Sequence, residues 1–164
     1  MTRIILLEEL KKATETAVSE LMLPVALQKG DTEQKYRAAD VHLMRLPDSS
    51  AATKKCPYIL HQFVIGEDKQ EPRERPESTA LIRSVFAVYF EDEQEGALAL
   101  LNLMERVRIF LLRHPVLGGQ FCLDLSEGFQ VAVDYEDTAP YFKGEMVTSW
   151  TIPAVEREDA RPWL

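Results

Sequence analysis

Two strand-like runs separated by a long charged segment limit the possible folds of this chain more than any other feature. The runs cover residues 56–65 and 81–90, and both are rich in the β-branched and aromatic residues that favour strands. The segment between them, Gly66–Thr79, contains two prolines and almost no apolar residue. Such a segment has too little apolar surface to pack on its own sheet. We therefore expect a long hairpin arm that is mobile in an isolated subunit and contacts another molecule.

Two other segments have the apolar spacing of amphipathic helices, Glu8–Leu23 and about Gln94–Arg113. Acidic residues precede the second helix and arginines end it, an arrangement that suits the helix dipole. Its expected apolar face consists of Leu98, Leu101, Met104, Val107, Ile109, Phe110 and Leu112. Trp150 alternates with its neighbours in a late strand and is expected in the core.

The remaining strands are expected at Val41–Pro47, in a hairpin formed by 121–125 and 129–135, and at Tyr141–Ile152. The order of elements predicts an α+β fold, in which two helices pack on one face of a mostly antiparallel sheet and a long hairpin loop projects. No repeat or shift in composition divides the chain. We expect a single domain over residues 1–164, with a core at about 5–153 and a C-terminal tail at 154–164.

Composition excludes several classes of function. Hydrophobic residues make up 46% of the chain, enough for one core, but no run approaches the ~20 apolar residues that span a bilayer. The apolar run near the N-terminus ends in Glu8 and Glu9, unlike a signal peptide, so we expect the chain to stay in the compartment where it is made. The net charge of −8 argues against nucleic acid as the main ligand. The isolated Cys56 and Cys122 are expected to be buried thiols.

The chain contains none of the strong catalytic motifs: a nucleophile elbow, a Walker loop, HExxH or GxGxxG. His42 and His61 could bind a metal ion together with Asp40, but their spacing defines no ligand set, and we favour polar residues on the solvent face of strands. His114 is expected to interact with the C-terminal end of a helix dipole. Carboxylates cluster at Glu91, Asp92, Glu93 and Glu95 and at Asp134, Glu136 and Asp137, where a helix cap and a polar turn are the favoured interpretations.

Two features suggest contacts with a protein partner. Arg73 and Arg75 lie among acidic residues in the long loop, and charges of mixed sign suit a protein surface better than a phosphate backbone. Trp163 lies one residue from the end of the sequence, where no local core can receive it, which makes it a candidate anchor on a partner.

Four segments, in this order, resemble the phage and prophage tail proteins that terminate the tail tube. Pro57–Ile59 opens a strand that ends in Gly66–Asp68, and the next strand leads through an acidic turn to a helix containing Asn102–Arg108. A late turn reads Ala139–Gly144, and the final strand holds Ser149–Pro153. Together these segments cover about residues 55–153, whereas the regions before Val41 and after Pro153 depart from the family.

The resemblance implies a structural virion protein and not an enzyme, without a cofactor or metal. Six copies would form a ring that caps the tail tube, ends its polymerisation and meets the head–tail connector, or neck protein. Partners would be the chain itself, the tail tube protein, the connector and, in a contractile tail, the sheath protein, with no membrane and no recognition of nucleic-acid sequence. Assembly would take place in the cytoplasm of the bacterial host. On this basis the expected interface residues are Glu67, Asp68, Arg73, Arg75, Tyr141 and Trp163.

Two alternatives remain open at this stage. The chain could be another neck subunit, such as a head–tail connector. It could also be a small α+β domain that binds a ligand or acts as a metal-dependent enzyme through the histidines or carboxylates named above.

Overall fold

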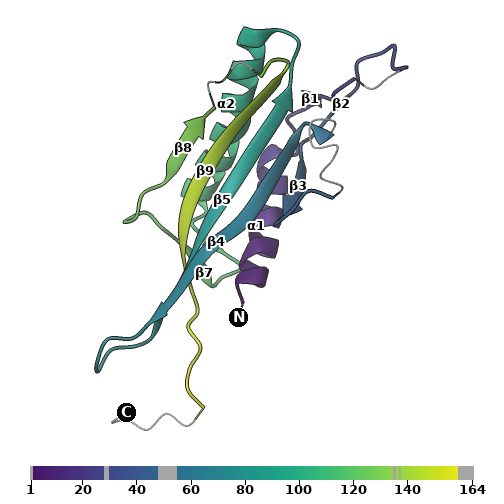
Figure 1. Cartoon of the computed structure of the whole chain (residues 1–164). Coiled ribbons are helices and arrows are strands. Elements are labelled where there is room, and N and C mark those ends of the chain that lie inside the picture. The colour runs from purple at the N-terminus through teal and green to yellow at the C-terminus, as the bar shows by residue number, and fades with distance from the viewer. Residues whose placement is uncertain (1, 28–29, 48–54, 135, 137, 159–164) are drawn as a thin grey trace.

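The computed structural model describes residues 2–27, 30–47, 55–134, 136 and 138–158. It has two helices on one face of a seven-stranded sheet, and a narrow arm extends from the lower end of that sheet (Figure 1). This is the α+β architecture that the order of elements predicts. β3 runs parallel to β4, whereas every other strand pair is antiparallel.

The first helix, α1, spans Arg3–Val18 and therefore begins five residues before the predicted start and ends five residues before the predicted end. Thr2 caps it by accepting a hydrogen bond from the backbone N–H of Ile5 at 3.3 Å. The N-terminal apolar run thus forms the first two turns of the helix, where Leu6 and Leu7 are buried. The predicted end was wrong because Leu23–Pro24 forms a short strand, β1, that pairs with β2 (Tyr36–Arg37).

The sheet has the order β3-β4-β5-β9-β7-β6, and β8 pairs with β9 outside this path. The three long central strands are β4 (Tyr58–Lys69), β5 (Glu77–Tyr89) and β9 (Tyr141–Ile152). The shorter strands are β3 (Asp40–Leu43), β6 (Val116–Leu117), β7 (Phe121–Asp124) and β8 (Gln130–Val133). β9 lies inside the sheet, with β5 on one side and β7 and β8 on the other.

The long charged segment is only in part a loop. β4 and β5 remain paired to Lys69 and Glu77, and only residues 70–76 connect them. The expected loop Gly66–Thr79 was too long because a two-stranded ribbon can satisfy its backbone hydrogen bonds without burying side chains. The arm is thus a continuation of the two central strands past the body of the sheet.

The predicted hairpin between residues 121–125 and 129–135 does not form. β7 pairs with residues 149–151 of β9, and β8 pairs with residues 144–147 of the same strand. The two short strands therefore follow one another along one edge of β9 instead of pairing together. The physical reason is the length of β9: a local hairpin would leave much of that edge without backbone partners.

The second helix, α2 (Glu93–Arg113), agrees closely with the prediction and has Asp92 as its N-cap. Its buried side is not the predicted face: Met104 and Val107 are buried, but Leu98, Leu101, Ile109 and Leu112 are exposed. The residues that contact the core are Gly96, Leu100, Leu103, Met104, Val107 and Leu111. The helix has two apolar stripes, and the sheet and α1 cover only one.

The core lies between the helices and the sheet and contains Trp150, which is fully buried as predicted, together with Phe86, Ile59 and Phe121. A second, smaller cluster lies on the opposite face of the sheet and includes Tyr58, Tyr89, Cys56 and Ala26. We call the face that carries the helices the helix face, and the opposite one the open face. The upper end of β4 and β5 is thus covered on both faces, whereas residues 67–75 at the lower end are exposed.

Candidate assembly surface

The tip of the arm is a tight turn that carries two arginines. The backbone N–H of Glu74 donates to the carbonyl of Glu71 at 3.0 Å, and the Gln70 side chain donates to the carbonyl of Glu74 at 2.9 Å. Arg73 has a φ of +67°, a conformation that costs a non-glycine residue free energy. Within the described part of the chain neither Arg73 nor Arg75 forms a salt bridge. The tip therefore presents two guanidinium groups that have no salt-bridge partner among the described residues.

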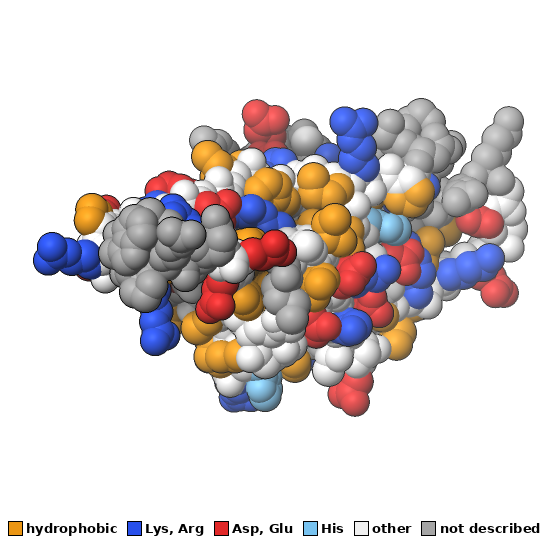
Figure 2. All heavy atoms as spheres, turned by 90° about the horizontal axis from the view of Figure 1, so that it is seen from below, with side chains coloured by type: hydrophobic (Ala, Val, Ile, Leu, Met, Phe, Trp, Pro, Cys, Tyr) orange, Lys and Arg blue, Asp and Glu red, His pale blue; other side chains and the backbone are white. Residues whose placement is uncertain are grey.

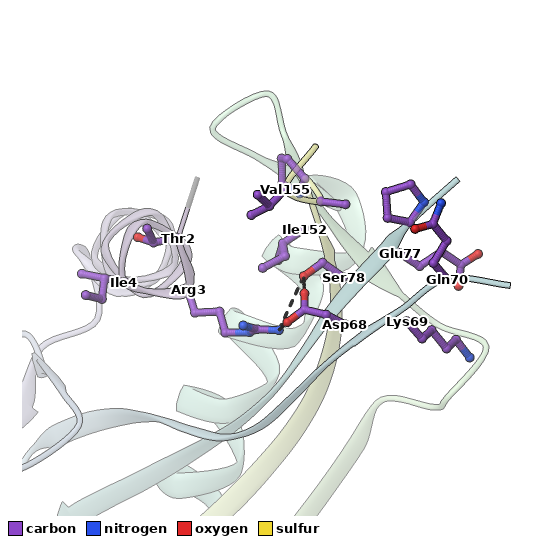
Figure 3. A pocket seen from close by; sticks show the side chains of 13 residues that line it. Thr2, Arg3, Ile4, Asp68, Lys69, Gln70, Glu77, Ser78, Ile152 and Val155 are labelled. Atoms are coloured by element: carbon purple, nitrogen blue, oxygen red, sulfur yellow. Dashed lines mark hydrogen bonds and ion pairs between the residues drawn. The ribbon is translucent and has the colours of Figure 1, made fainter. Parts of the chain in front are cut away.

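The base of the arm is fastened to the start of α1 by Arg3 (Figure 3). The Arg3 guanidinium donates to the carbonyl of Thr79 at 3.0 Å and lies 3.4 Å from the Asp68 carboxylate. Asp68 also accepts a hydrogen bond from Ser78 across the two strands. This hydrogen bond, with a smaller contribution from Arg3, lowers the pKa of the Asp68 carboxyl, so the carboxylate stays charged.

Gly66 leaves the room that Arg3 needs to cross the ribbon. A Cβ at this position would lie 2.3 Å from the Nε atom of Arg3, so any other residue would displace the guanidinium. The same side chain lies over the ring of Phe63, 5.7 Å from its centroid. Sequence reasoning named Gly66 only as part of a motif and missed Arg3, because nothing in the sequence relates residue 3 to residues 66–79.

A cavity of about 580 Å³ lies on this side of the arm's base. It is bordered by the start of α1, by the two arm strands, by Ile152 at the end of β9 and by the segment that follows, including Val155 (Figure 3). Val155 is 81% exposed. Because residues 153–155 line this cavity together with the start of α1, the segment after β9 leaves the sheet on the helix face.

A second cavity, of about 420 Å³, lies on the open face at the base of the arm, and we call it the open-face groove. Ile65 and Leu81 form an apolar floor, and Glu67 is among the carboxylates around it. Figure 2 views the molecule from the end where the arm projects, and basic side chains stand out at its left edge. Of the predicted interface residues, Glu67, Asp68, Arg73 and Arg75 lie together on the arm, the first two on β4 and the arginines in the turn that connects it to β5.

The other two predicted interface residues are not brought to the arm. Tyr141 lies at the opposite end of β9, next to Tyr89, with ring centroids 5.6 Å apart. It packs against the cluster on the upper part of the open face. Trp163 lies outside the described residues.

His61 is fully buried, so its expected place on the solvent face was wrong. It lies on the helix face of β4, where its Nε2 atom is 2.8 Å from the Thr14 hydroxyl and its Nδ1 atom 2.7 Å from the Ser84 hydroxyl. Since Thr14 donates its own proton to the carbonyl of Leu10, it accepts from Nε2–H, and Nδ1 accepts from Ser84. Burial lowers the pKa of His61 to about 3, so the ring is neutral.

This arrangement leaves no ring nitrogen of His61 for a metal ion. His42 is part-buried on β3, and burial lowers the pKa of its imidazole. No group of metal-ligating side chains occurs within the described ranges. The metal site with His42, His61 and Asp40 is therefore not supported.

The acidic residues near α2 have local roles. Asp92 accepts from the backbone N–H of Glu95 at 2.9 Å, and Glu91 accepts from the Tyr89 hydroxyl at 3.1 Å. Asp134 accepts from the backbone N–H of Glu136 at 3.1 Å, whereas Asp137 lies outside the described residues. These contacts are the predicted helix cap and polar turn. His114 is the C-cap of α2, at the expected end of the helix dipole.

The two cysteines differ. Cys56 is buried, and burial raises the pKa of its thiol to about 11. Cys122 is exposed, contrary to expectation. Its neighbours Phe121 and Leu123 point into the core, so the alternation along β7 places Cys122 on the open face.

No helix in the described part of the chain is both long and apolar enough to cross a membrane. The sequence matches no protein-family model, and no curated protein matches it.

Proposed function

We propose that this protein is a tail terminator, a structural subunit whose six copies form a ring on the end of a phage tail tube. The observation that carries the proposal is the arm: a two-stranded ribbon that leaves the body and presents Arg73 and Arg75 without a salt bridge in the described chain. Charged groups on a projecting ribbon gain their partners when another chain is present. The ordered resemblance over residues 55–153 adds the type of assembly.

The exposed edge of the arm supports the same proposal. β3 covers only Tyr58–His61 of β4, so the edge of β4 from Gln62 to Lys69 has no strand beside it among the described residues. Val64 and Ile65 on this stretch are 52% and 61% exposed. Exposed edges with apolar side chains are places where another chain can pair.

The proposed role is to stop growth of the tube and to present the opposite side of the ring to the neck. Its partners would be the tube protein, the head–tail connector and, in a contractile tail, the sheath protein. Each contact around a closed ring is heterologous, one surface of a subunit against a different surface of the next. No catalytic turnover, cofactor or metal belongs to this proposal.

The test has two parts. Native mass spectrometry at micromolar concentration, with and without added divalent metal, should give a metal-independent hexamer in the presence of the tube protein. Electron micrographs of tails assembled without this protein should show irregular lengths and no joined heads. Tails of uniform length that fail only to join heads would assign the chain to another neck position, and normal tails with heads would reject both roles.

A further inference from the structure

The open-face groove has a defined shape and chemistry. One row across the sheet brings Ile65, Leu81, Ser149 and Asp124 side by side, on β4, β5, β9 and β7. The first two form an apolar floor, and carboxylates surround it. These carboxylates are Glu67, Glu77, Asp124 and Glu127, with Lys69 as the one basic residue of the lining.

The groove carboxylates have no cationic partner in the described part of the chain, where none of the four takes part in a salt bridge. Asp124 accepts from the backbone N–H and the hydroxyl of Ser126 at 2.9 and 2.6 Å. These hydrogen bonds keep the pKa of the Asp124 carboxyl below its ordinary value, so it remains an anion. An acidic groove with an apolar floor suits a partner that is both basic and apolar.

The arm tip has the complementary chemistry. It carries Arg73 and Arg75 between two prolines, Pro72 and Pro76. The strands stay paired for about 13 Å from Ile65 to Lys69 and carry the tip of a given chain away from the apolar floor of its own groove. The tip of another copy can approach that floor from outside.

We propose that the open-face groove receives the arm tip of a second copy of this chain. The guanidinium groups of Arg73 and Arg75 then face the carboxylates of Glu67 and Glu127, and the tip prolines cover Ile65 and Leu81. This inference rests on the proposed ring. Tip and groove are different surfaces, so the same contact repeats from each copy to the next until the ring closes.

Other occupants fit the groove less well. A phosphate or nucleic acid would meet four carboxylates. The chain's own C-terminal segment leaves β9 on the helix face, where Pro153, Ala154 and Val155 border the other cavity. A second copy brings the two arginines and the prolines in one segment.

The test uses two variants of opposite kind. The arm variant carries Arg73→Glu and Arg75→Glu, and the groove variant carries Glu67→Arg and Glu127→Arg. Each should fold, as judged by circular dichroism, and each alone should lose at least tenfold in association by sedimentation velocity, with a smaller loss at high salt. Glu8→Arg with Glu20→Arg, two exposed positions on and after α1, is the control and should assemble normally.

Two combinations should restore assembly. A chain that carries all four substitutions has an acidic tip and a basic groove, and should form rings by itself. An equal mixture of the arm variant and the groove variant should also form rings in which the two kinds of subunit alternate, because each tip then meets a groove of opposite charge. Alternation requires an even number of subunits, which a hexamer satisfies.

Different experimental results would reject the contact between tip and groove and the proposed ring. If the arm variant fails to assemble but the groove variant forms normal rings, the tip docks elsewhere, and the ring stands without this contact. If both variants fail and neither combination restores assembly, the pairing of tip and groove is also rejected. A wild-type chain that stays monomeric in the presence of the tube protein overturns both the contact and the ring.

A cross-link gives a direct test of the contact. A chain that carries Arg75→Cys and Glu127→Cys in a Cys122→Ser background should form disulfides between adjacent copies, seen as a ladder of covalent oligomers on a non-reducing gel.

Discussion

The two ends of β4 and β5 are built from the same pair of strands but have opposite surroundings. At the upper end the helices cover one face and the cluster around Tyr58 and Tyr89 covers the other. At the lower end the strands continue into the arm, where residues 67–75 are exposed. The pairing of the two strands is continuous through both ends apart from one register shift between Phe63 and Ile65. Backbone pairing therefore shapes both ends, whereas side-chain burial stabilises only one.

The difference indicates that the two ends of this hairpin have separate roles, one in folding and one in contacts between subunits. The upper end supplies stability through apolar burial, which is the main favourable contribution to folding. The lower end contributes little to the stability of a single subunit, so its side chains are free to serve a contact between subunits. Variants at matched positions on the two ends should therefore separate folding from assembly.

The largest expected difference is between two isoleucines of β4. Ile59 is fully buried, whereas Ile65 is 61% exposed. Ile59→Ala should lower the free energy of unfolding by about 2–5 kcal/mol, because it leaves a cavity in the core. Ile65→Ala should change it by less than about 0.5 kcal/mol, as is usual at surface positions, and weaken association instead. Chemical denaturation gives the first quantity and sedimentation the second, and equal losses of stability would contradict these separate roles.

The second effect is a loss of stability in mild acid that arises at the upper end. The pKa of His61 is about 3 in the folded chain, and the ordinary value is 6.5. Below pH 6.5, His61 therefore binds a proton in the unfolded chain but not in the folded chain. As a result, the free energy of unfolding falls as the pH drops from 6.5 toward 3. Between pH 6.5 and 4.5 the loss should be about 2–3 kcal/mol, at 1.36 kcal/mol per pH unit.

Denaturation at several pH values measures this slope. His61→Gln should remove most of it in that range, whereas His114→Asn, at an exposed helix end, should keep it. Asp68, Glu105 and Asp124 have lowered pKa values, so their charged forms stabilise the folded chain at neutral pH. That stabilisation is lost only below about pH 4.5 and does not affect the slope between pH 6.5 and 4.5. An unchanged slope in His61→Gln would show that the histidine is not the neutral, buried group described above.

A smaller effect is expected at the junction between the two ends, where Arg3 crosses Gly66. Gly66→Ala places a Cβ in the space of the guanidinium and should release Arg3 from Asp68 and Thr79. The cost should be about 1 kcal/mol, the usual contribution of a hydrogen bond, since the bonds from Arg3 to the Thr79 carbonyl are part-buried and the contact with Asp68 is exposed. Hydrogen exchange should show faster exchange in the first turn of α1 and in the arm, with the upper strands unchanged. Arg3→Ala should reproduce that pattern, and a different pattern would contradict the fastening role.

The smallest effect on folding is expected at the tip. Replacing Gln70–Pro76 by Asn-Gly, a favoured two-residue hairpin turn, should leave the melting temperature nearly unchanged while it abolishes assembly. Arg73→Gly should stabilise the subunit by up to about 1 kcal/mol, because glycine accepts the positive φ of +67° without strain. Native mass measurements on the shortened arm test the loss of assembly, and chemical denaturation of Arg73→Gly tests the gain in stability. Normal rings from the shortened arm would show that the arm is not an assembly element.

Much of the fold could be predicted because local patterns and tertiary packing agree. The α2 helix begins with Asp92 and acidic residues and ends with Arg113, so its bounds follow from capping and the dipole. The three long strands are dense in β-formers. The buried face of α2 could not be predicted, because the helix has two apolar stripes and only the position of the sheet selects Leu100 and Leu103 over Leu98 and Leu101.

Of the candidate surface, Arg73 and Arg75 were predictable as charges in a segment that cannot bury itself. The fastening of Arg3 over Gly66 and the row that joins Ile65 to Asp124 were not, because each combines residues from distant elements. The burial of His61 could not be predicted for the same reason, because a histidine among strand residues suggests an exposed position. Its two ring nitrogens can be buried because Thr14 from α1 and Ser84 from β5 form hydrogen bonds with them.

The class of fold, the α2 helix, the central strands and the presence of a charged arm follow from local patterns, since they depend on composition and on periods of two and 3.6 residues. The tertiary structure decided which of two apolar stripes is buried, that β7 and β8 share one edge of β9, and how far β4 and β5 stay paired. Those outcomes depend on competition among surfaces and strand edges far apart in the chain, and no local pattern records that competition.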